Sequence, residues 1–358
     1  MTTNAVITGW GMYAPSRVLT NEELSTMVDT SDEWIVSRTG IRERRIAADD
    51  ETTNTLSVLA ARDALAVAGI DPLDIDLVIV GTCSPDYPLP ATAVLVATEL
   101  GARRAAGFDL QAACSGFLYA LATGSGFIRS GMYRNVLVIG VEVLSRFINW
   151  QDRGTCVLFG DGAGAVLLSA SDQPGGLIGW ELFSDGTGCE GIIVPAGGSA
   201  RPASAQTVAD KLHYIQMAGA EVYKYATRQM ADSAVAALKA ANLSVEEVDQ
   251  FVFHQANLRI IKSVEKALSI PEEKVFVNIE KYGNTSAASV PMALVEAVAA
   301  GRIKPGDKIL MVAFGAGYTA GAAVVEWTAD PNRAFLAPGD QTRLGKPRVE
   351  EPQLAAAR

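Results

Sequence analysis

The segment AARDALAVAGIDPLDIDLVIV, residues Ala60–Val80, returns in altered form as SAVAALKAANLSVEEVDQFVF at Ser233–Phe253. In both copies an Ala-rich run of helical period leads through a polar turn into an apolar, β-branched run. Asp76 matches Asp249 in this repeat, and the segment NVLVIGVE returns as DKILMVAF, with Asn135 matching Asp307 at an offset shorter by one. Because the order is the same in both places, the sequence indicates an internal duplication.

Apolar runs of strand length alternate with Ala- and Leu-rich stretches along the whole chain, which predicts an α/β protein with largely buried sheets. We expect two similar halves, residues 1–172 and 173–328, followed by a polar, proline-containing tail or surface strap at 329–358. The expected strands are Ala5–Thr8, Leu77–Thr82, Ala106–Leu110, Val136–Val141, Ala165–Ser169, Gln250–His254, Val275–Asn278, Lys308–Ala313 and Ala322–Trp327, and the expected helices include Asn54–Ala68, Ala91–Leu100, Gly116–Ile128 and Gly219–Ala241.

The composition of the chain excludes several classes of protein and of partner. The 358 residues are 49% hydrophobic and carry a net charge of −10, which excludes disorder and argues against nucleic acid or an anionic membrane as the main partner. No signal peptide begins the sequence and no apolar run approaches the roughly 20 residues that span a bilayer, so we expect a soluble cytoplasmic protein. Four scattered cysteines form no disulfide or zinc framework. With only His213 and His254, a multi-histidine metal site is nearly excluded.

Cys114 lies in FDLQAACSGFLYAL, where a strand-like run meets a helix-like stretch that starts at Gly116. Near a helix N-terminus, partial positive charge and free N–H groups favour a thiolate, and the amide of Cys114 can stabilise an oxyanion. A buried structural cysteine is the alternative, and local sequence does not decide between the two. Cys83, Cys156 and Cys189 lack this context and are expected in the core or in loops.

Two further residues join Cys114 as candidates. His254 ends the apolar run QFVFH, at the sheet edge where active-site groups of α/β proteins collect. Asn284, in KYGNTSAASVPMAL, precedes a helix-like stretch, where capping is its ordinary role. In a duplicated fold the turns that carry Cys114 and Asn284 meet about a pseudo-dyad, so we expect one shared site. Backbone amides near Ala316, in FGAGYTAG, could complete an oxyanion hole.

Six blocks, TSDEWIVSRTGIRERR, QAACSGF, DRGTCVLFGDGAGA, HQANLRII, GNTSAASVP and FGAGYT, occur in that order between Val6 and Trp327. Together they resemble the β-ketoacyl-acyl-carrier-protein synthase III family of the thiolase superfamily. The resemblance implies a thiolase-like five-layer αβαβα fold and an obligate homodimer. It also implies a decarboxylative condensation of an acyl-CoA primer with malonyl-acyl carrier protein, which initiates fatty-acid synthesis through an acyl-cysteine without a metal or redox cofactor.

The resemblance also implies residue roles. Cys114 would be the nucleophile, His254 and Asn284 the pair that handles decarboxylation, and the N–H groups of Cys114 and Ala316 the oxyanion hole. Leu89 would close the partner subunit's acyl pocket, at a position where an acetyl-preferring form has Phe. Coenzyme A would contact Trp34, Arg38, Arg153, Gly219 and Asn257, and the carrier protein would contact Gln255, Ala256, Asn257, Leu258, Arg259, Lys224 and Lys266.

Three alternatives stay open at this stage. A specialised relative could prime polyketides, condense long acyl chains or transfer an acyl group, and release of carbon dioxide separates condensation from transfer. A cysteine hydrolase would use the same three residue types, although the duplicated α/β pattern argues against a papain-like fold. A carrier-binding scaffold without chemistry is the third reading, and it requires that no acyl-enzyme forms.

Overall fold

Two five-stranded sheets of identical topology form the framework of the computed structural model, which describes residues 3–331. The strand orders are β1-β7-β6-β4-β5 and β8-β14-β13-β11-β12, and in each sheet the first three strands are antiparallel and the last three parallel. The first sheet comprises β1 (Asn4–Tyr13), β7 (Gly162–Ser171), β6 (Asn135–Glu142), β4 (Leu77–Gly81) and β5 (Ala106–Leu110). The second comprises β8 (Gly176–Ser184), β14 (Thr319–Glu326), β13 (Lys308–Gly315), β11 (Gln250–Phe253) and β12 (Val275–Phe276).

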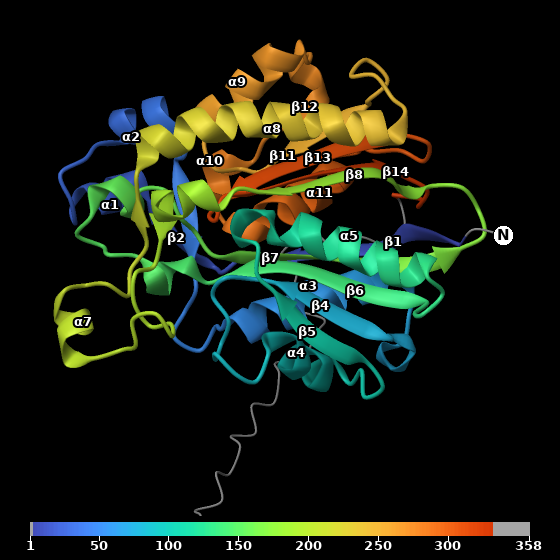
Figure 1. The fold of residues 1–358 in the computed structure, drawn as a ribbon, viewed down its shortest axis with the longest axis horizontal. Helices are drawn as coiled ribbons and strands as arrows, with labels where there is room; N and C mark the ends of the chain where they lie inside the picture. Colours follow the sequence, from blue (N-terminus) through green and yellow to red (C-terminus); the bar gives the residue numbers. More distant parts are fainter. Residues whose placement is uncertain (1–2, 332–358) are drawn as a thin grey trace, which may run out of the picture.

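Six longer helices supply three further layers (Figure 1). Helices α3 and α4 cover the outer face of the first sheet, α5 and α11 lie between the sheets, and α8 and α9 cover the outer face of the second sheet. Their bounds are Thr53–Ala68, Thr92–Leu100, Gly116–Arg129, Ser289–Ala299, Gly219–Ala241 and Leu258–Leu268, respectively. The expected five-layer αβαβα arrangement is therefore confirmed.

The sequences of the helices explain their layers. Helix α11 reads SVPMALVEAVA and buries nearly every residue, because a helix that is apolar on all sides needs a sheet on each face. Helix α8 buries one stripe, from Val222 to Leu238, and exposes the charged residues between them to solvent, as expected of a surface helix. The apolar cluster between the sheets includes Trp10 and Trp327, whose rings are tilted by 56° with centroids 5.0 Å apart.

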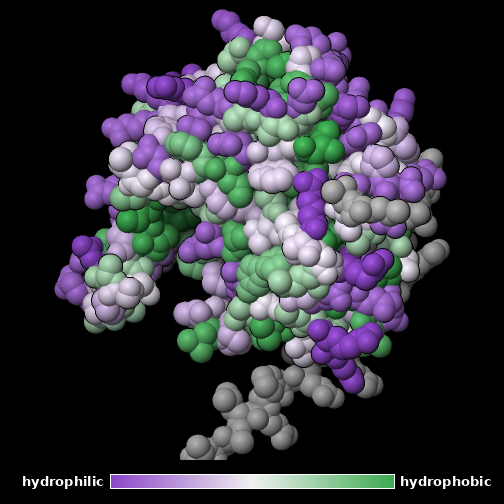
Figure 2. Space-filling view, turned by 45° about the vertical axis from the view of Figure 1, so that its right-hand side comes forward, coloured by the Kyte–Doolittle hydropathy of each residue, from purple (hydrophilic) through white to green (hydrophobic). Residues whose placement is uncertain are grey.

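Short elements gather at one end of the layers, at the left of Figure 1. They include α1 (Asn21–Ser25), α2 (Asp32–Thr39), α6 (Arg153–Cys156), α7 (Ala205–Ala209), α10 (Ile279–Tyr282), β2 (Arg17–Thr20), β3 (Glu43–Ile46), β9 (Ile192–Ile193) and β10 (Gln216–Met217). The segment around α7 projects from the body, and Figure 2 shows this lobe at its lower left with hydrophilic and hydrophobic residues mixed on its surface.

The hydrogen-bond register shows how the two halves correspond. Leu77 lies opposite Val136 in the first sheet, and Gln250 lies opposite Ile309 in the second. The strands β4 and β6 therefore correspond to β11 and β13 at one and the same sequence offset. The alignment of Asn135 with Asp307 expected from the sequence is wrong by one residue, because two apolar runs match almost as well in neighbouring registers. The boundary expected at residue 172 lies between β7 and β8.

Two 3₁₀ turns meet at the centre of the molecule. The turn η2 (Ala113–Ser115) leads into α5, η6 (Ser286–Ala288) leads into α11, and the two turns, which correspond at the same offset, pack against each other. Glycines make room for them. A Cβ added at Gly140 of β6 would lie 2.3 Å from the carbonyl oxygen of Ala287, and one added at Gly315 of β13 would lie 2.5 Å from the backbone nitrogen of Cys114.

All nine strands expected from the sequence are present, and so are the four helices. The sequence analysis missed β8, an edge strand with two glycines whose outward residues include Trp180 and Leu182. Within residues 3–331 no helix is both long enough and apolar enough to cross a membrane. Most of the expected tail, residues 332–358, lies outside the described residues.

The close approach at Gly140 gives a direct test of the packing. Gly140→Ala should lower the free energy of unfolding by about 1–3 kcal/mol, because the new methyl group meets backbone rather than a movable side chain. Gly126, inside α5, has open space at the same position, so Gly126→Ala should be neutral or stabilise by up to about 1 kcal/mol. Urea unfolding measures both, and equal effects of the two variants would contradict the packing described.

Candidate active site

Cys114 lies in η2, directly before the N-terminus of α5, and Ala113 reaches this turn through a positive φ of 46°. Its thiol faces the hydroxyl of Ser286 and the backbone N–H groups of Cys114 and Ala316. Burial raises the pKa of the thiol to about 11; the Ser286 and N–H contacts oppose this shift, while the Glu142 carboxylate adds to it. The two amides expected as an oxyanion hole therefore face the sulfur from two different halves of the chain.

His254 follows β11 directly, and its backbone N–H extends the ladder to the carbonyl of Val312 at 2.8 Å. The imidazole is 2% exposed, and its Nδ1 lies 2.5 Å from the hydroxyl of Ser289 at the start of α11. Burial lowers the pKa of His254 to about 3, so the ring is neutral at physiological pH. Ser289 Oγ also accepts the N–H of Gln255 at 3.3 Å. When Ser289 donates its own proton to Nδ1, the neutral ring carries its proton on Nε2.

Asn284 is fixed by its own turn. Its Oδ1 accepts the N–H of Ser286 at 2.8 Å, and its backbone joins the strand-like segment at Leu158 and Gly160. The Nδ2 group has no hydrogen-bond partner within residues 3–331, so it is available as a donor. Asn284 does not correspond to Cys114 in the duplication, because the register of the two sheets makes Ala287 the counterpart of Cys114. The two turns nevertheless meet, as the pseudo-dyad argument expects.

Trp34 and Arg153, two of the residues expected at coenzyme A, lie together at the surface. The guanidinium of Arg153 lies 5.1 Å from the ring centroid of Trp34 and also bonds the carbonyl of Asp29 at 2.8 Å. Arg38 is exposed at the end of α2, and its carbonyl accepts the Nδ2 group of Asn257 at 3.0 Å. Gly219 is exposed as the first residue of α8.

Short chain segments connect this surface to the buried residues. Asn257 follows His254 by three residues and caps α9, since its Oδ1 accepts the N–H of Arg259 at 2.9 Å. From Arg153 the chain runs through α6 to Leu158, whose carbonyl accepts the N–H of Asn284 at 2.8 Å. Asn257 is thus committed to two contacts within the chain, and one hydrogen of its amide group remains for a ligand.

The residues expected at the carrier protein divide into exposed and buried ones. Arg259 and Lys266 are exposed on α9, and Lys224 is exposed on α8, which α9 contacts through a 2.9 Å hydrogen bond between the hydroxyls of Tyr223 and Ser263. Ala256 and Leu258 are half-buried. Gln255 is 1% exposed, and its amide bonds only groups inside the fold, including the carbonyl of Phe253 at 2.7 Å. Gln255 therefore does not belong to the exposed basic surface, because its side chain completes the turn after β11.

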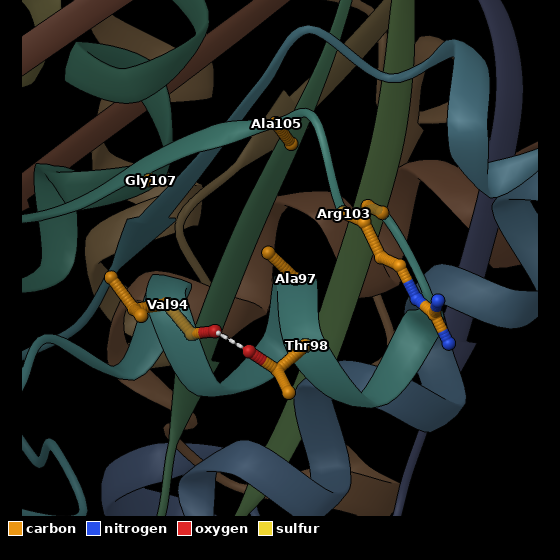
Figure 3. Close-up of a pocket in the computed structure, with 7 residues that line it drawn as sticks. Val94, Ala97, Thr98, Arg103, Ala105 and Gly107 are labelled. Carbon is orange, nitrogen blue, oxygen red and sulfur yellow. Dashed lines mark hydrogen bonds between the residues drawn. The ribbon is translucent and has the colours of Figure 1, made fainter.

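Leu89 is 82% exposed in the loop between β4 and α4. Beside this region, a shallow pocket of about 390 Å³ is lined by small residues of α4 and of the chain leading into β5, together with Arg103 (Figure 3). In this view Thr98 turns back to the carbonyl of Val94, at 2.9 Å. The pocket contains none of the catalytic candidates.

The sequence analysis missed two polar residues of the site, Glu142 and Ser286. Glu142 ends β6 and is fully buried, and Ser286 occupies the positive-φ position of η6, with φ of 49°. A carboxylate that ends the apolar run NVLVIGVE is the signal that could have revealed the first. Among residues 3–331 no group of three or more His, Cys, Asp or Glu side chains is arranged to hold a metal ion.

Comparison with known proteins gives consistent matches over the fold. Residues 108–186 match the family model of 3-oxoacyl-[acyl-carrier-protein] synthase III, and residues 238–327 match the model of its C-terminal part. The β-ketoacyl-[acyl-carrier-protein] synthase III of Roseiflexus sp. (strain RS-1) is 53% identical over 329 residues, which are 92% of this chain and 100% of that protein.

Two solved structures are similar along nearly their whole length. The 3-oxoacyl-[acyl-carrier-protein] synthase III of Aquifex aeolicus VF5 is 46% identical with a TM-score of 0.84, covering 90% of this chain and 100% of that one. The priming β-ketosynthase of the R1128 polyketide pathway is 40% identical with a TM-score of 0.86, covering 92% and 98%.

The buried, neutral His254 should make stability depend on pH. Its pKa is about 3 in the fold and about 6.5 in an unfolded chain, so the unfolded state binds the additional proton as pH falls from about 6.5 towards 3, and stability is lost over that range. Between pH 7.5 and 5 this loss amounts to about 2 kcal/mol. We expect His254→Gln to lose correspondingly less stability over that interval than the wild type, as measured by urea unfolding at both pH values. His213→Gln is the control, and a His254→Gln curve parallel to the wild type would refute the burial effect.

Proposed function

This chain belongs to the β-ketoacyl-[acyl-carrier-protein] synthase III family, and from that membership and the geometry around Cys114 we propose the reaction it performs. An acyl-coenzyme A primer first acylates Cys114. Malonyl-acyl carrier protein then condenses with the acyl-enzyme, which releases carbon dioxide and gives a β-ketoacyl-acyl carrier protein. Formation of this product initiates fatty-acid synthesis.

The observation that carries this proposal is the pair of amides that face the Cys114 sulfur. When the sulfur attacks the thioester carbonyl, the carbonyl oxygen becomes an oxyanion, and the N–H groups of Cys114 and Ala316 are positioned to bind it. Collapse of the tetrahedral intermediate breaks the bond to coenzyme A and leaves the acyl group on Cys114. The position of η2 before α5 adds favourable helix-terminal charge.

Two neutral donors suit the second half-reaction. The Nε2–H group of His254 and the Nδ2 group of Asn284 donate to the thioester oxygen of the malonyl group, where negative charge develops as carbon dioxide departs. The resulting enolate forms a carbon–carbon bond to the acyl carbonyl, and the Cys114 sulfur leaves. Because both donors are uncharged, their hydrogen bonds strengthen as the enolate forms, which is the requirement for rate acceleration.

The same geometry weighs against the alternatives. Simple acyl transfer and thioester hydrolysis develop no enolate, so they leave the paired donors without a role. A hydrolase would also need a base beside an attacking water, and burial makes His254 a weak base. A polyketide-priming reaction uses the same chemistry with a different primer, and it remains the second candidate because the R1128 priming synthase is similar over nearly the whole chain.

The substrates bind at two surfaces in this proposal. The adenine of coenzyme A stacks at Trp34 and Arg153, its phosphates meet Arg38, and its pantetheine arm passes Gly219 and Asn257 towards Cys114. The acidic carrier protein binds Arg259, Lys266 and Lys224, which form a local basic surface on a chain of net charge −10. Ala256 and Leu258 border that surface.

We also propose a homodimer, in which Leu89 of each protomer closes the acyl pocket of its partner. The support is an unpaired edge: β5 is the outer strand of the first sheet, it is partly exposed, and the apolar side chains of Tyr87, Leu89 and Val94 lie exposed nearby. A cytoplasmic location fits the four free thiols of the chain, since a reducing compartment preserves them. The proposed cycle needs no metal or redox cofactor.

Intact-protein mass spectrometry tests the proposed function. Incubation with acetyl-, isobutyryl- and hexanoyl-coenzyme A should add the mass of the acyl group, and malonyl-acyl carrier protein should then discharge it as carbon dioxide and a β-ketoacyl product. Cys114→Ser should not be labelled, because a serine hydroxyl is a far weaker nucleophile than a thiol in this setting. No labelling of the wild type, or equal labelling of Cys114→Ser, would overturn the mechanism.

A charge reversal tests the carrier-protein surface. Arg259→Glu should raise the KM for malonyl-acyl carrier protein about tenfold and leave the rate of Cys114 acylation by acyl-coenzyme A unchanged, because only the acidic partner approaches α9 in this proposal. Lys239→Glu is the matched control: Lys239 is exposed on α8 about 22 Å along the helix from Lys224. Equal KM changes for the two variants would indicate general charge attraction instead of a docking surface.

A further inference from the structure

The nucleophile has no evident proton acceptor in the roles assigned so far. Burial raises the pKa of the Cys114 thiol to about 11, so the thiolate is scarce at neutral pH. The imidazole of His254 is a poor acceptor, because burial lowers its pKa to about 3 and Nδ1 is occupied by Ser289. Because the pKa of this thiol is raised, acylation at neutral pH needs a group that takes its proton.

Glu142 is a buried carboxylate beside the nucleophile. Its Oε1 atom accepts the hydroxyl of Ser286 at 3.1 Å and the thiol of Cys83 at 3.1 Å, and its Oε2 atom accepts the hydroxyls of Ser84 at 2.5 Å and Thr82 at 3.2 Å. The backbone N–H of Cys83 lies 3.2 Å from both oxygens.

These partners bear on the protonation state of Glu142 in the free enzyme. Ser84 Oγ accepts the N–H of Val143 at 2.9 Å, so its own proton points at Glu142. The backbone N–H of Cys83 can only donate, and the hydroxyl and thiol groups around Glu142 can all donate as well, so this set of contacts can hold a carboxylate. Within residues 3–331 Glu142 forms no ion pair, and the titratable groups that face it are the thiols of Cys83 and Cys114. Burial without a cation raises the pKa of Glu142, so its affinity for a proton is larger than that of an ordinary carboxylate.

Ser286 connects the two groups. Its hydroxyl donates to Glu142 at 3.1 Å, and it also faces the Cys114 sulfur, because η6 packs against η2. The backbone of Ser286 is fixed by its N–H bond to Asn284 Oδ1, in the positive-φ conformation of η6. The order thiol, hydroxyl, carboxylate is the arrangement that moves a proton over two short steps.

The duplicated fold indicates that this carboxylate is not a requirement of the architecture. In the register of the two sheets the counterpart of Glu142 is Gly315, which ends β13 as Glu142 ends β6. The second half therefore completes the same strand and the same turn without a carboxylate. A buried, unpaired charge is expensive, so its presence in one half alone points to the site rather than to the fold.

We propose that Glu142 takes the proton of the Cys114 thiol through the hydroxyl of Ser286, holds it in the acyl-enzyme, and returns it after condensation. This inference rests on the proposed function. In acylation the S–H bond of Cys114 breaks as the C–S bond to the acyl carbon forms. The thiol proton passes to Ser286 Oγ, the Ser286 proton passes to Glu142 Oε1, and coenzyme A leaves as a thiolate that takes its proton from water.

Condensation reverses the transfer. The enolate carbon attacks the acyl carbonyl and the Cys114 thiolate leaves, so Ser286 donates its proton to the sulfur and recovers one from Glu142. Over the cycle one proton is consumed from water, and Glu142 ends ionised as it began. In the interval the site carries a neutral carboxylic acid instead of a buried anion, which removes a repulsive charge from the place where the malonyl carboxylate binds and the enolate forms.

Rapid-mixing measurements of Cys114 acylation over pH 6–10 test the relay. For the wild type we expect a rate that is nearly independent of pH above neutrality, because the base is already ionised. Ser286→Ala and Glu142→Gln should be slower by about 100-fold at pH 7, and their rates should rise nearly tenfold per pH unit, because acylation then depends on the thiolate fraction. Ser57→Ala, which removes a buried hydroxyl from α3, is the control for loss of a hydrogen bond.

A loss that is the same at every pH would mean that Glu142 and Ser286 only hold the turn, and would overturn the relay, as would wild-type rates in both variants. If the wild type itself forms no acyl-enzyme, the proposed function fails instead. A second measurement uses only the wild-type enzyme, so it does not depend on whether a variant folds. The infrared difference spectrum of acylated minus free wild-type enzyme should gain the C=O stretch of a protonated carboxylic acid, and a spectrum without that band refutes a proton held on Glu142.

Discussion

The contact between the turns η2 and η6 is the constraint on which the rest of the structure depends. The two turns precede the two helices of the central layer, and they can meet because glycines in the strands beneath them leave room for their backbones. The carbonyl of Ala287 lies against Gly140, and the backbone of Cys114 lies against Gly315. At either glycine an added side chain would overlap with these backbone atoms. The same approach brings Ser286 to the Cys114 sulfur and sets Ala316, one residue beyond β13, where its N–H faces that sulfur. The packing of the two sheets, the placement of the central helices and the arrangement of groups around Cys114 therefore all depend on the contact between these two turns.

Burial at this contact determines which chemistry is available. It holds His254 neutral and raises the pKa values of both Cys114 and Glu142. In water an imidazole and a thiol of ordinary pKa would exchange the proton between themselves. Here burial makes the imidazole a weak base, and in the proposed reaction it acts as a donor from Nε2 while Ser289 contacts Nδ1. Separation of the proton acceptor from the enolate-stabilising donors is thus a consequence of desolvation, with no cation in either role.

Periodicity and the internal repeat predicted an α/β protein with two similar halves, because buried strands and helices of this kind repeat their apolar pattern in both halves. The five-layer arrangement was expected only from the family resemblance. The repeat also predicted that the turns carrying Cys114 and Asn284 meet, since each turn contains small residues and precedes a helix-like stretch, and the position of His254 after an apolar run predicted that it lies at a sheet edge. Three features were beyond that reasoning. Strand β8 contains two glycines and exposes Trp180 and Leu182 at a sheet edge, so its pattern is not that of a buried strand. The resemblance assigned Gln255 to the carrier-protein surface, but its side chain is buried and its amide completes a turn. Glu142 and Ser286 are joined by a contact between distant parts of the sequence, which no local pattern encodes.

The duplication clarifies how one fold came to hold two sets of functional groups. In the register of the two sheets His254 corresponds to Gly81, Ser289 to Gly116, and Gly315 to Glu142. In the first half Gly81 packs directly on Gly116, where a Cβ would come within 2.8 Å of the helix backbone. In the second half the equivalent positions have space for an imidazole and the hydroxyl that orients it. Gly315 leaves room for the nucleophile, whereas Glu142, its counterpart, fills the same space with a carboxylate. Each half therefore supplies side chains where the other half has glycine. The site depends on these three differences between the halves: His254 against Gly81, Ser289 against Gly116, and Glu142 against Gly315.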